Sequence, residues 1–373
     1  MRIVFAIDSF KGSLSSLMAG NAAAEGARRV FPDAECIVRP LADGGEGTVE
    51  ALVSGLGGER LEVKVTVPAL RPVKAVYGKV GETAVMEMAQ AAGITLVSGV
   101  ERDPLRTTTF GVGEMIRDAI AHGCRRFIVG IGGSATNDGG AGMLQALGFR
   151  LLDCDGRDIP RGGGGLAALA KVDRASALPE LRECVFRIAC DVTNPLCGER
   201  GASAVFGPQK GATPAMVAEL DAALAHFASV SGGRADTPGA GAAGGLGFAF
   251  HDFLGGELRS GVEIVLEETR FEDFVRGADL VVTGEGRLDS QTIMGKAPIG
   301  VARAAKKFGV KVIAFSGCVT PDAGIVNEHG IDAFFPVLRQ VTTLEEALEK
   351  GRAAENLAAT AEQVFRCFRL GAL

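Results

Sequence analysis

The stretch IVFAIDSFKGS, residues 3–13, decides the fold more than any other part of the chain. Its first five residues are apolar without alternation, which is typical of a strand covered by helices on both faces. The polar turn 8–13 follows at once, and a helical pattern begins at Ser15. A buried strand, a polar turn and a helix form the unit from which parallel sheets are built. The sequence therefore predicts an α/β protein.

The same pattern recurs along the rest of the chain. Apolar runs predict further strands at 36–38, 127–131, 185–189, 280–283 and 312–315. Helical patterns separate these runs, at 15–31, 113–122, 213–228, 298–308 and 343–368. The last of these helices begins with Thr343 and Glu346, which form a capping box. Strands that alternate with helices favour a parallel sheet with right-handed crossovers.

Two regions depart from this pattern and indicate a second domain. Residues 61–67 alternate between apolar and polar side chains, which is typical of a half-exposed antiparallel strand. Residues 150–262 are richer in glycine and in loops. We predict a Rossmann-like, doubly wound parallel sheet domain built from residues 1–58, 111–148 and 265–373. A second, mixed α/β domain, inserted into the first, would consist of residues 59–110 and 149–264.

Composition excludes several classes of protein. The 373 residues carry a net charge of -6 and show no basic run with interleaved aromatic residues, so we expect no nucleic-acid partner. The eight cysteines form no C-x-x-C pair and the four histidines are scattered, so no zinc site is predicted. The apolar run at the N-terminus is too short for a signal peptide, and no stretch of about 18 apolar residues occurs. We expect a cytoplasmic protein with free thiols and no membrane association.

Polar, glycine-containing loops follow four of the predicted strands. Ligands of open α/β sheets bind outside the carboxyl ends of the strands, near the point where strand order reverses. If all four strands belong to one parallel sheet, their loops meet at one edge. The loops are 8–13, 42–48, 132–140 and 284–290.

The chemistry of these loops suits phosphate groups. Gly132 and Gly133 precede a predicted helix near Gly139, where free backbone N–H groups and the helix dipole attract anions. Lys11 and Arg287 can neutralise a transferred phosphoryl group or hold a substrate carboxylate. Aspartate and glutamate side chains nearby can carry Mg²⁺. Phosphoryl transfer needs oriented hydrogen-bond donors, a cationic side chain, a metal ion and a carboxylate that accepts the hydroxyl proton.

Familiar nucleotide motifs are absent. The chain has no P-loop sequence and lacks the H-R-D and D-F-G motifs of protein kinases. One G-x-G-x-x-G occurs at 239–244, but no strand is predicted before it, and a dinucleotide fingerprint requires one. We therefore predict a flexible loop there, which weakens a dehydrogenase interpretation.

Five motifs together resemble the class I glycerate kinases of bacteria. The resemblance covers essentially the whole chain and rests on DSFKGS at 8–13, ADGGEGT at 42–48, GIGGSATNDGG at 130–140, CDVTNPL at 190–196 and GEGRLD at 284–289. It implies ATP-dependent phosphorylation of D-glycerate with Mg²⁺, giving 2-phosphoglycerate. It also implies a Rossmann-like domain that carries an inserted α/β domain.

We assign roles within this reaction from the chemistry of the residues. The ATP phosphates would lie against Gly132, Gly133, Ser134 and Asn137. Asp138 and Glu285 are the predicted metal ligands.

The remaining roles concern the substrate and the transferred group. Lys11 would balance charge on the phosphoryl group, and Arg287 is the first candidate for the glycerate carboxylate. Ser9 and Asp289 are further candidates for substrate binding. Asp191 would accept the hydroxyl proton, with Asp43 and Asp289 as rivals for that role.

Three alternatives remain open on the sequence. The product is 3-phosphoglycerate if the primary hydroxyl reacts. An NAD(P)-dependent hydroxy-acid dehydrogenase would need a working dinucleotide loop, and a sugar-acid binding protein would need neither nucleotide nor metal. The sequence predicts no oligomeric state.

Overall fold

The computed structural model describes residues 1–371 and divides into two compact units. The first unit comprises Met1–Asp43, Glu50–Gly57 and the chain from Val262 onward, and the second comprises Gly44–Val49 and Gly58–Gly261. Residues 372 and 373, which end the predicted range 265–373, lie outside the described residues. The prediction of a two-domain α/β protein is confirmed.

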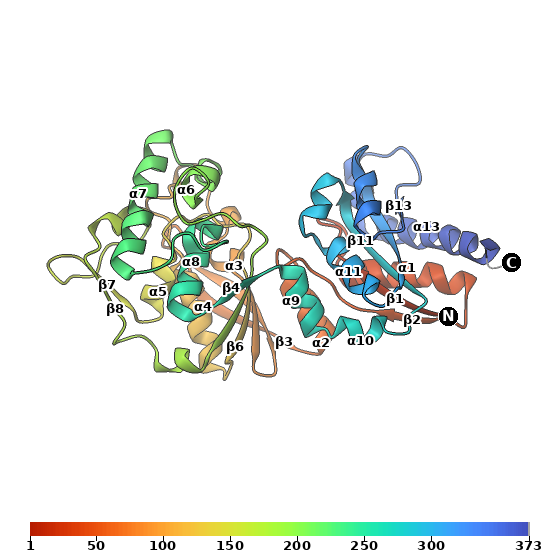
Figure 1. Ribbon diagram of the computed structural model, residues 1–373, viewed down its shortest axis with the longest axis horizontal. Coiled ribbons are helices and arrows are strands. Elements are labelled where there is room, and N and C mark those ends of the chain that lie inside the picture. The colour runs from red at the N-terminus through yellow and green to blue at the C-terminus, as the bar shows by residue number, and fades with distance from the viewer. Residues whose placement is uncertain (372–373) are drawn as a thin grey trace. The chain divides into compact units, whose positions relative to one another are not determined.

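The sheet of the first unit has five parallel strands in the order β13-β12-β11-β1-β2 (Figure 1). The strands are β1 (Arg2–Ile7), β2 (Glu35–Val38), β11 (Leu280–Leu288), β12 (Lys311–Val319) and β13 (Ala333–Pro336). Strand order reverses beside β1, because β2 pairs with one edge of it and β11 with the other. This is the order of a doubly wound sheet. The Rossmann-like prediction is confirmed for this unit.

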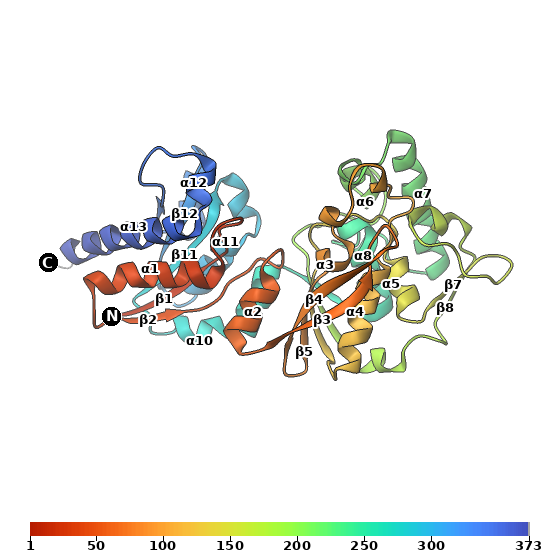
Figure 2. The ribbon, with the colours of Figure 1, turned by 180° about the vertical axis from the view of Figure 1, so that it is seen from behind.

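Helices from opposite ends of the chain pack together in the first unit. Helix α1 (Ser16–Val30) and helix α13 (Lys350–Gly371) lie side by side, as Figures 1 and 2 both show. Buried alanines line the contact, and such small side chains let two helices approach closely. The other helices are α2 (Thr48–Leu56), α9 (Gly261–Glu268), α10 (Phe271–Val275), α11 (Ala297–Lys306) and α12 (Leu344–Leu348), with 3₁₀ turns at Ser290–Met294 and Ala323–His329.

Two predicted elements of the first unit differ from the structure in length. Strand β11 continues through Leu288, and β12 through Val319, so residues 284–288 are strand and not loop. The predicted helix 343–368 is interrupted at Glu349, whose backbone is extended, and becomes α12 and α13. Its capping box between Thr343 and Glu346 is confirmed.

The second unit contains a six-stranded mixed sheet in the order β10-β9-β6-β5-β4-β3. Its strands are β3 (Glu59–Thr66), β4 (Pro72–Val80), β5 (Thr83–Glu87), β6 (Arg126–Gly130), β9 (Val185–Ala189) and β10 (Glu257–Arg259), and a small sheet pairs β7 (Arg150–Leu152) with β8 (Lys171–Asp173). Strand β3 pairs antiparallel with β4, as its alternation predicted, while β5, β6, β9 and β10 are parallel.

Residues 111–148 lie in the second unit, and the prediction that they belong to the Rossmann-like domain is wrong. Strand β6 pairs with β5 on one edge and with β9 on the other. The error has a physical reason. A continuous apolar run shows that a strand is buried on both faces, but both sheets of this protein contain parallel strands buried in that way.

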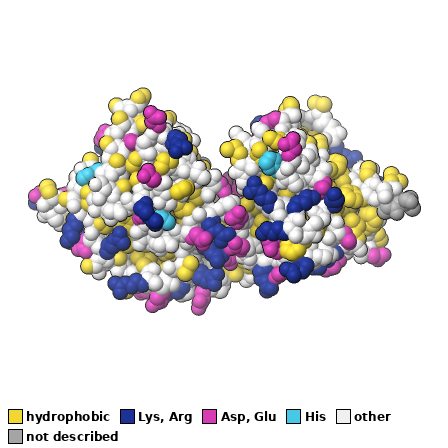
Figure 3. All heavy atoms as spheres, in the orientation of Figure 1, with side chains coloured by type: hydrophobic (Ala, Val, Ile, Leu, Met, Phe, Trp, Pro, Cys, Tyr) yellow, Lys and Arg dark blue, Asp and Glu magenta, His cyan; other side chains and the backbone are white. Residues whose placement is uncertain are grey.

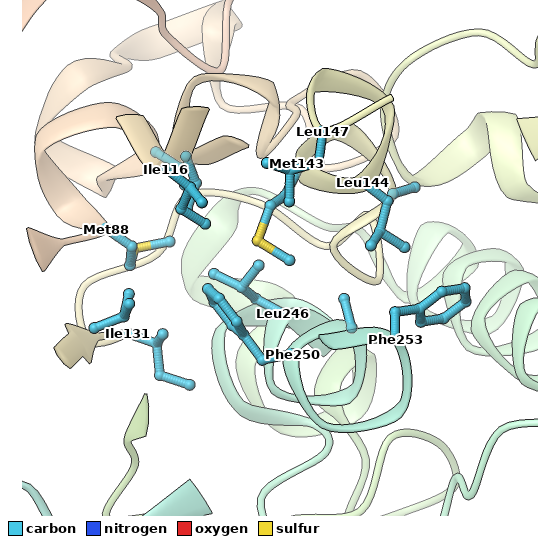
Figure 4. Close-up of a cluster of buried hydrophobic side chains, with 14 of the residues drawn as sticks. Met88, Ile116, Ile131, Met143, Leu144, Leu147, Leu246, Phe250 and Phe253 are labelled. Carbon is cyan, nitrogen blue, oxygen red and sulfur yellow. The ribbon is translucent and has the colours of Figure 1, made fainter. Parts of the chain in front are cut away.

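The core of the second unit forms between its sheet and several helices. Figure 4 shows Met88, Ile116, Met143, Leu246 and Phe250 within it. The rings of Phe127 and Phe186, on neighbouring strands, stack with centroids 4.7 Å apart. The helices are α3 (Ala89–Ala92), α4 (Phe110–Ala121), α5 (Ala141–Ala146), α6 (Ala202–Phe206), α7 (Pro214–Ser231) and α8 (Ala242–Leu254), with 3₁₀ turns at Ile94–Leu96, Gly99–Glu101, Gly163–Ala168, Pro179–Glu183 and Pro208–Lys210.

The glycine-rich segment 239–244 is packed into this unit, and its prediction as a flexible loop is wrong. Ala243, Gly244 and Gly245 adopt left-handed backbone conformations in succession at the start of α8. The Gly244 carbonyl accepts the Gly139 N–H at 2.9 Å. The segment therefore lies against the loop that follows β6.

Tyr77 is the single tyrosine of the chain and lies fully buried on β4. Its hydroxyl donates a hydrogen bond of 2.8 Å to Asp118 Oδ2 on α4. Burial and this hydrogen bond raise the pKa of Tyr77. The side chain thus joins the sheet of the second unit to the helix that covers it.

The surface carries mixed charge. On the face drawn in Figure 3, acidic and basic side chains are interspersed. Among residues 1–371, no helix combines the length and apolar character needed to cross a membrane.

Candidate functional site

The switch point of the first unit brings together several of the predicted site residues. Strands β1 and β11 are adjacent, with Ile7 aligned to Gly284, and the Asp8 N–H donates to the Gly284 carbonyl at 2.9 Å. A Cβ added to Gly286 would lie 3.5 Å from the backbone nitrogen of Lys11, so the loop after β1 runs along β11. The carboxyl ends of two strands that flank a reversal of strand order are the usual ligand site of such sheets.

Asp8 is a buried carboxylate at this switch point, with 6% of the residue exposed. Its Oδ1 accepts the Ser9 N–H at 2.7 Å. Burial, followed by the charge of Asp43, raises the pKa of Asp8 to about 7, and the Lys11 ammonium opposes the rise. A carboxyl group with a pKa near neutrality can take up and release a proton under working conditions.

Glu285 is a second buried carboxylate, on β11, with 8% exposed. Its Oε1 accepts the Thr292 hydroxyl at 2.6 Å, and its Oε2 lies 3.7 Å from the Lys296 ammonium. Burial is the largest cause of the raised pKa of Glu285, and the charges of Asp289 and Asp43 add to it. Burial is therefore the main cause of the raised pKa of both Asp8 and Glu285, and neighbouring carboxylates add to it.

Arg287 and Asp289, both predicted to bind substrate, lie together. Arg287 Nε is 3.2 Å from Asp289 Oδ2, and the arginine side chain is 65% exposed. Asp289 caps the 3₁₀ turn that follows β11 by accepting the Gln291 N–H at 3.0 Å. An ion pair this exposed contributes little stability, so Arg287 can exchange it for another carboxylate.

A separate set of predicted residues lies at the carboxyl edge of the sheet in the second unit. Strands β5, β6 and β9 end together there, with Gly130 aligned to Glu87 and to Ala189. Gly132 and Gly133 follow β6 and are exposed, whereas Ser134 is buried. Asp191 follows β9 and is exposed, and its Oδ1 accepts the Gly261 N–H at 3.2 Å.

Gly132 is informative because nothing in the described part of the protein requires a glycine there. Its backbone is outside the left-handed region, and a Cβ added to it would meet no atom within 4 Å. Its neighbour Gly133 differs, since its φ of +74° disfavours other residues. Open space in front of an exposed backbone is the arrangement that a closely approaching ligand needs.

Asn137 and Asp138 are buried inside the second unit and do not face solvent. Asn137 Nδ2 donates to Ser203 Oγ at 2.9 Å. Asp138 Oδ2 accepts the Thr109 N–H at 2.8 Å and its hydroxyl at 2.9 Å, and Asp138 Oδ1 accepts the Gly140 N–H at 3.1 Å. The carboxylate thereby caps the start of α4 and of α5.

These contacts correct two predictions. Asp138 as a metal ligand conflicts with its complete burial, because an ion would have to displace hydrogen bonds that hold two helices. Asn137 as a nucleotide-binding side chain conflicts with its burial in the same way. The Ser134 hydroxyl is also turned inward, accepting the Thr136 N–H at 3.1 Å. In this loop only the Gly132 and Gly133 backbone is presented to solvent.

The prediction that all four polar loops share one sheet edge is also wrong. Strands β1, β2 and β11, from which three of these segments lead, belong to the five-stranded sheet, and β6 belongs to the six-stranded sheet. The segment 44–49 groups with the second unit, where Glu87 accepts the N–H groups of Gly47 and Val49 at 3.0 Å each.

Four residues of these sites were missed by the site assignment from sequence. Asp8 stands first after β1, and that position was the available signal. Lys296 and Glu87 carry no local signal, because their partners lie in other elements. The same holds for Lys210, whose ammonium donates to the Thr136 carbonyl at 2.6 Å. The described residues contain no group of three or more His, Cys, Asp or Glu that could hold a metal ion.

Comparison with known proteins finds relatives that match nearly the whole length of the chain. A family model described as "Glycerate kinase family" matches residues 3–369. A Haemophilus influenzae protein named "Glycerate kinase" is 50% identical over 373 residues, covering 98% of each chain. An Escherichia coli protein named "Glycerate 2-kinase" is 50% identical, covering 96% of this chain and 98% of its own.

The fold has a close counterpart among solved structures. A crystal structure of the candidate glycerate kinase 2 from Salmonella typhimurium LT2 superposes with a TM-score of 0.91 at 48% identity. The alignment covers 100% of this chain and 99% of that chain.

Proposed function

The chain belongs to the glycerate kinase family, and from that premise we propose that it phosphorylates D-glycerate with ATP, giving 2-phosphoglycerate and ADP. One observation carries the proposal. Identity of 50% extends over nearly the full length of an Escherichia coli protein named for phosphorylation at position 2. Both units are covered by that match, so neither unit is left without a counterpart.

The exposed backbone of Gly132 and Gly133 is our proposed contact for the ATP phosphates. Because glycine has no side chain, a phosphate chain can approach its backbone N–H group closely. The absence of any steric or conformational need for glycine at 132 among the described residues supports this role. The Ser134 hydroxyl would support the loop from its inner side and not contact the nucleotide.

Gly132→Ala is expected to fold as the wild type does and to bind ATP about tenfold more weakly. The added methyl group meets no protein atom within 4 Å, so the melting temperature stays unchanged or rises slightly. The methyl would occupy the space that the phosphate needs. Isothermal titration with ATP and a thermal melt measure the two quantities. A variant that melts normally and keeps its ATP affinity contradicts the assignment.

The carboxylate of glycerate would bind Arg287. Arg287 is exposed and paired with Asp289, so it can form a bidentate pair with a small acid. Ser9 and Asp289, which flank the same switch point, remain our proposals for the substrate hydroxyl groups. Lys11 would balance the charge of the transferred phosphoryl group.

Two carboxylates are proposals for accepting the hydroxyl proton. The sequence predicts Asp191, which is exposed after β9 and accepts the Gly261 N–H. Asp8 is the choice that the geometry favours, because it is buried at the switch point beside Ser9 and has a pKa of about 7. A base with a pKa near the working pH is the more effective one. Asp43 and Asp289 remain rivals with less support.

The charge at the switch point favours a divalent cation, although the described residues include no ready-made group of three or more metal-ligating side chains. The carboxylates of Asp8, Asp43 and Glu285 repel one another, and a cation would relieve that repulsion. Glu285 would hold Mg²⁺ together with substrate phosphates, the usual arrangement when a protein supplies only one or two carboxylates. Bound there, the ion would neutralise charge on the phosphoryl group.

The proposed reaction is tested by incubating the purified chain with D-glycerate, ATP and Mg²⁺. Phosphorus NMR of the product is expected to show 2-phosphoglycerate. A 3-phosphoglycerate signal would contradict the regiochemistry alone, and loss of ATP without a phosphorylated acid would contradict the kinase proposal. Oxidation of NAD(P)H by hydroxypyruvate would support a dehydrogenase in its place.

We further propose that the protein works in the cytoplasm. All eight cysteines are free, including the exposed Cys154, Cys318 and Cys367. Exposed unpaired thiols fit a reducing compartment.

A further inference from the structure

Lys210 is a buried cation that the proposed reaction has not used. It ends the 3₁₀ turn between α6 and α7, and only 2% of it is exposed. Its ammonium donates a 2.6 Å hydrogen bond to the Thr136 carbonyl and lies 3.4 Å from Ser134 Oγ. No carboxylate of the described residues forms an ion pair with it, and the charge of Asp138 is the only titratable influence on it.

The two partners of Lys210 belong to the loop whose other side is exposed. Ser134 and Thr136 face inward, and Gly132 and Gly133, one to two residues earlier in the chain than Ser134, face solvent. The segment that begins α8 holds the same loop, because the Ser134 hydroxyl donates to the Ala243 carbonyl at 3.4 Å. The ammonium therefore contacts the inner side of the loop that carries the exposed glycines.

A buried cation without a counter-ion is costly, and its cost is reduced when an anion comes near. Burial accordingly lowers the pKa of Lys210 to about 7. Asp138 acts on the Lys210 ammonium without forming an ion pair with it, and an anion at Gly132 and Gly133 would add further negative charge. The long side chain reaches the loop from a different element, so it also fixes the loop's shape.

We propose that Lys210 is a positioning residue for a polyphosphate, holding the inner side of the 132–136 loop and placing a positive charge behind its exposed glycines. The ligand class is the phosphate chain of a nucleoside di- or triphosphate and not its base or sugar. The inference rests on the proposed function, since that function places the phosphates at this loop.

Lys210→Met tests the proposal because it removes the charge and nearly keeps the volume. We expect binding of ATP, ADP and inorganic tripolyphosphate to weaken about ten- to hundredfold in isothermal titration, with adenosine binding unchanged. The KM for ATP should rise while the KM for D-glycerate stays the same. A loss shared equally by glycerate and ATP would overturn the proposal, because it would indicate general damage.

The pH dependence of tripolyphosphate binding distinguishes an effect of the Lys210 charge from an effect of side-chain packing. Wild-type affinity for tripolyphosphate should fall more steeply between pH 6 and pH 8.5 than that of Lys210→Met, since Lys210 loses its proton in this range. The titration of the ligand is common to both proteins and cancels in the comparison. Parallel pH profiles would overturn the proposal.

Two further variants keep the result interpretable. Tyr77→Phe removes a buried hydrogen bond elsewhere in the second unit and should leave every affinity unchanged. Lys210→Gln replaces Lys210→Met if the methionine variant does not fold. If Lys210→Gln binds tripolyphosphate with wild-type affinity, the proposal is overturned. Wild-type kinase activity is recorded separately. If D-glycerate is not phosphorylated while tripolyphosphate binding still depends on Lys210, the proposed function fails and the anion site stands.

Discussion

Asp8→Asn is expected to lower kcat for D-glycerate phosphorylation by about 10²- to 10⁴-fold. Asparagine has nearly the shape of a protonated aspartate, so the packing at the end of β1 is kept, but the amide cannot take up the hydroxyl proton. Steady-state kinetics at saturating ATP and Mg²⁺ measure the effect. Asp191→Asn is the matched variant on the other candidate. If Asp191→Asn carries the loss and Asp8→Asn stays within a few-fold of wild type, Asp8 is not the base.

The same substitution should stabilise the protein at alkaline pH, which separates lost chemistry from lost structure. The pKa of Asp8 rises from 3.8 to about 7 on folding, so the folded state loses stability as the pH increases through this range. Asparagine mimics the neutral form and avoids that loss. Denaturation at pH 8 without Mg²⁺ should show a gain on the order of 4 kcal/mol, and the gain should vanish below about pH 4. A destabilised Asp8→Asn at pH 8 would contradict the burial argument.

Lys11→Ala is expected to lower kcat/KM for both ATP and D-glycerate by about 10²- to 10³-fold. The Lys11 side chain is exposed in the turn after β1, so its removal leaves the core intact and the melting temperature unchanged. A cation that stabilises the transferred phosphoryl group acts in the transition state, which both substrates share. Steady-state kinetics with each substrate varied in turn give the two values.

The control for Lys11 is another exposed lysine, away from the switch point. Lys350→Ala, at the start of α13, should keep full activity. Lys11→Arg should recover part of the loss, because the charge is restored with a different shape. An effect confined to the KM for glycerate would assign Lys11 to the substrate carboxylate instead.

Local sequence patterns predicted the elements of the fold well and their assembly less well. The apolar run 3–7 and the helical patterns 15–31 and 213–228 predicted β1, α1 and α7 closely. The assignment of 111–148 failed because the choice of sheet depends on pairing between strands far apart in sequence. The apolar run 127–131, which contains most of β6, would suit either sheet, and only the pairing of β6 with β5 and β9 decides between them.

The site shows the same division between local and distant information. The exposed glycines at 132 and 133 could be found from composition and position alone. The prediction of Asp138 as a metal ligand failed because a sequence motif does not show where a carboxylate points. This carboxylate accepts backbone N–H groups at the start of two helices and does not face solvent. Lys210 could not be found, since its role depends on Ser134 and Thr136, which lie 76 and 74 positions earlier.

The lone tyrosine has a practical consequence for spectroscopy. The chain has no tryptophan, and Tyr77 belongs to the second unit, so intrinsic tyrosine fluorescence reports on that unit alone. Circular dichroism reports on the helices of both units. Melting curves from the two signals will therefore coincide if the chain unfolds as one cooperative body and will separate if each unit melts by itself. A tryptophan introduced into the first unit would give that unit a reporter free of background.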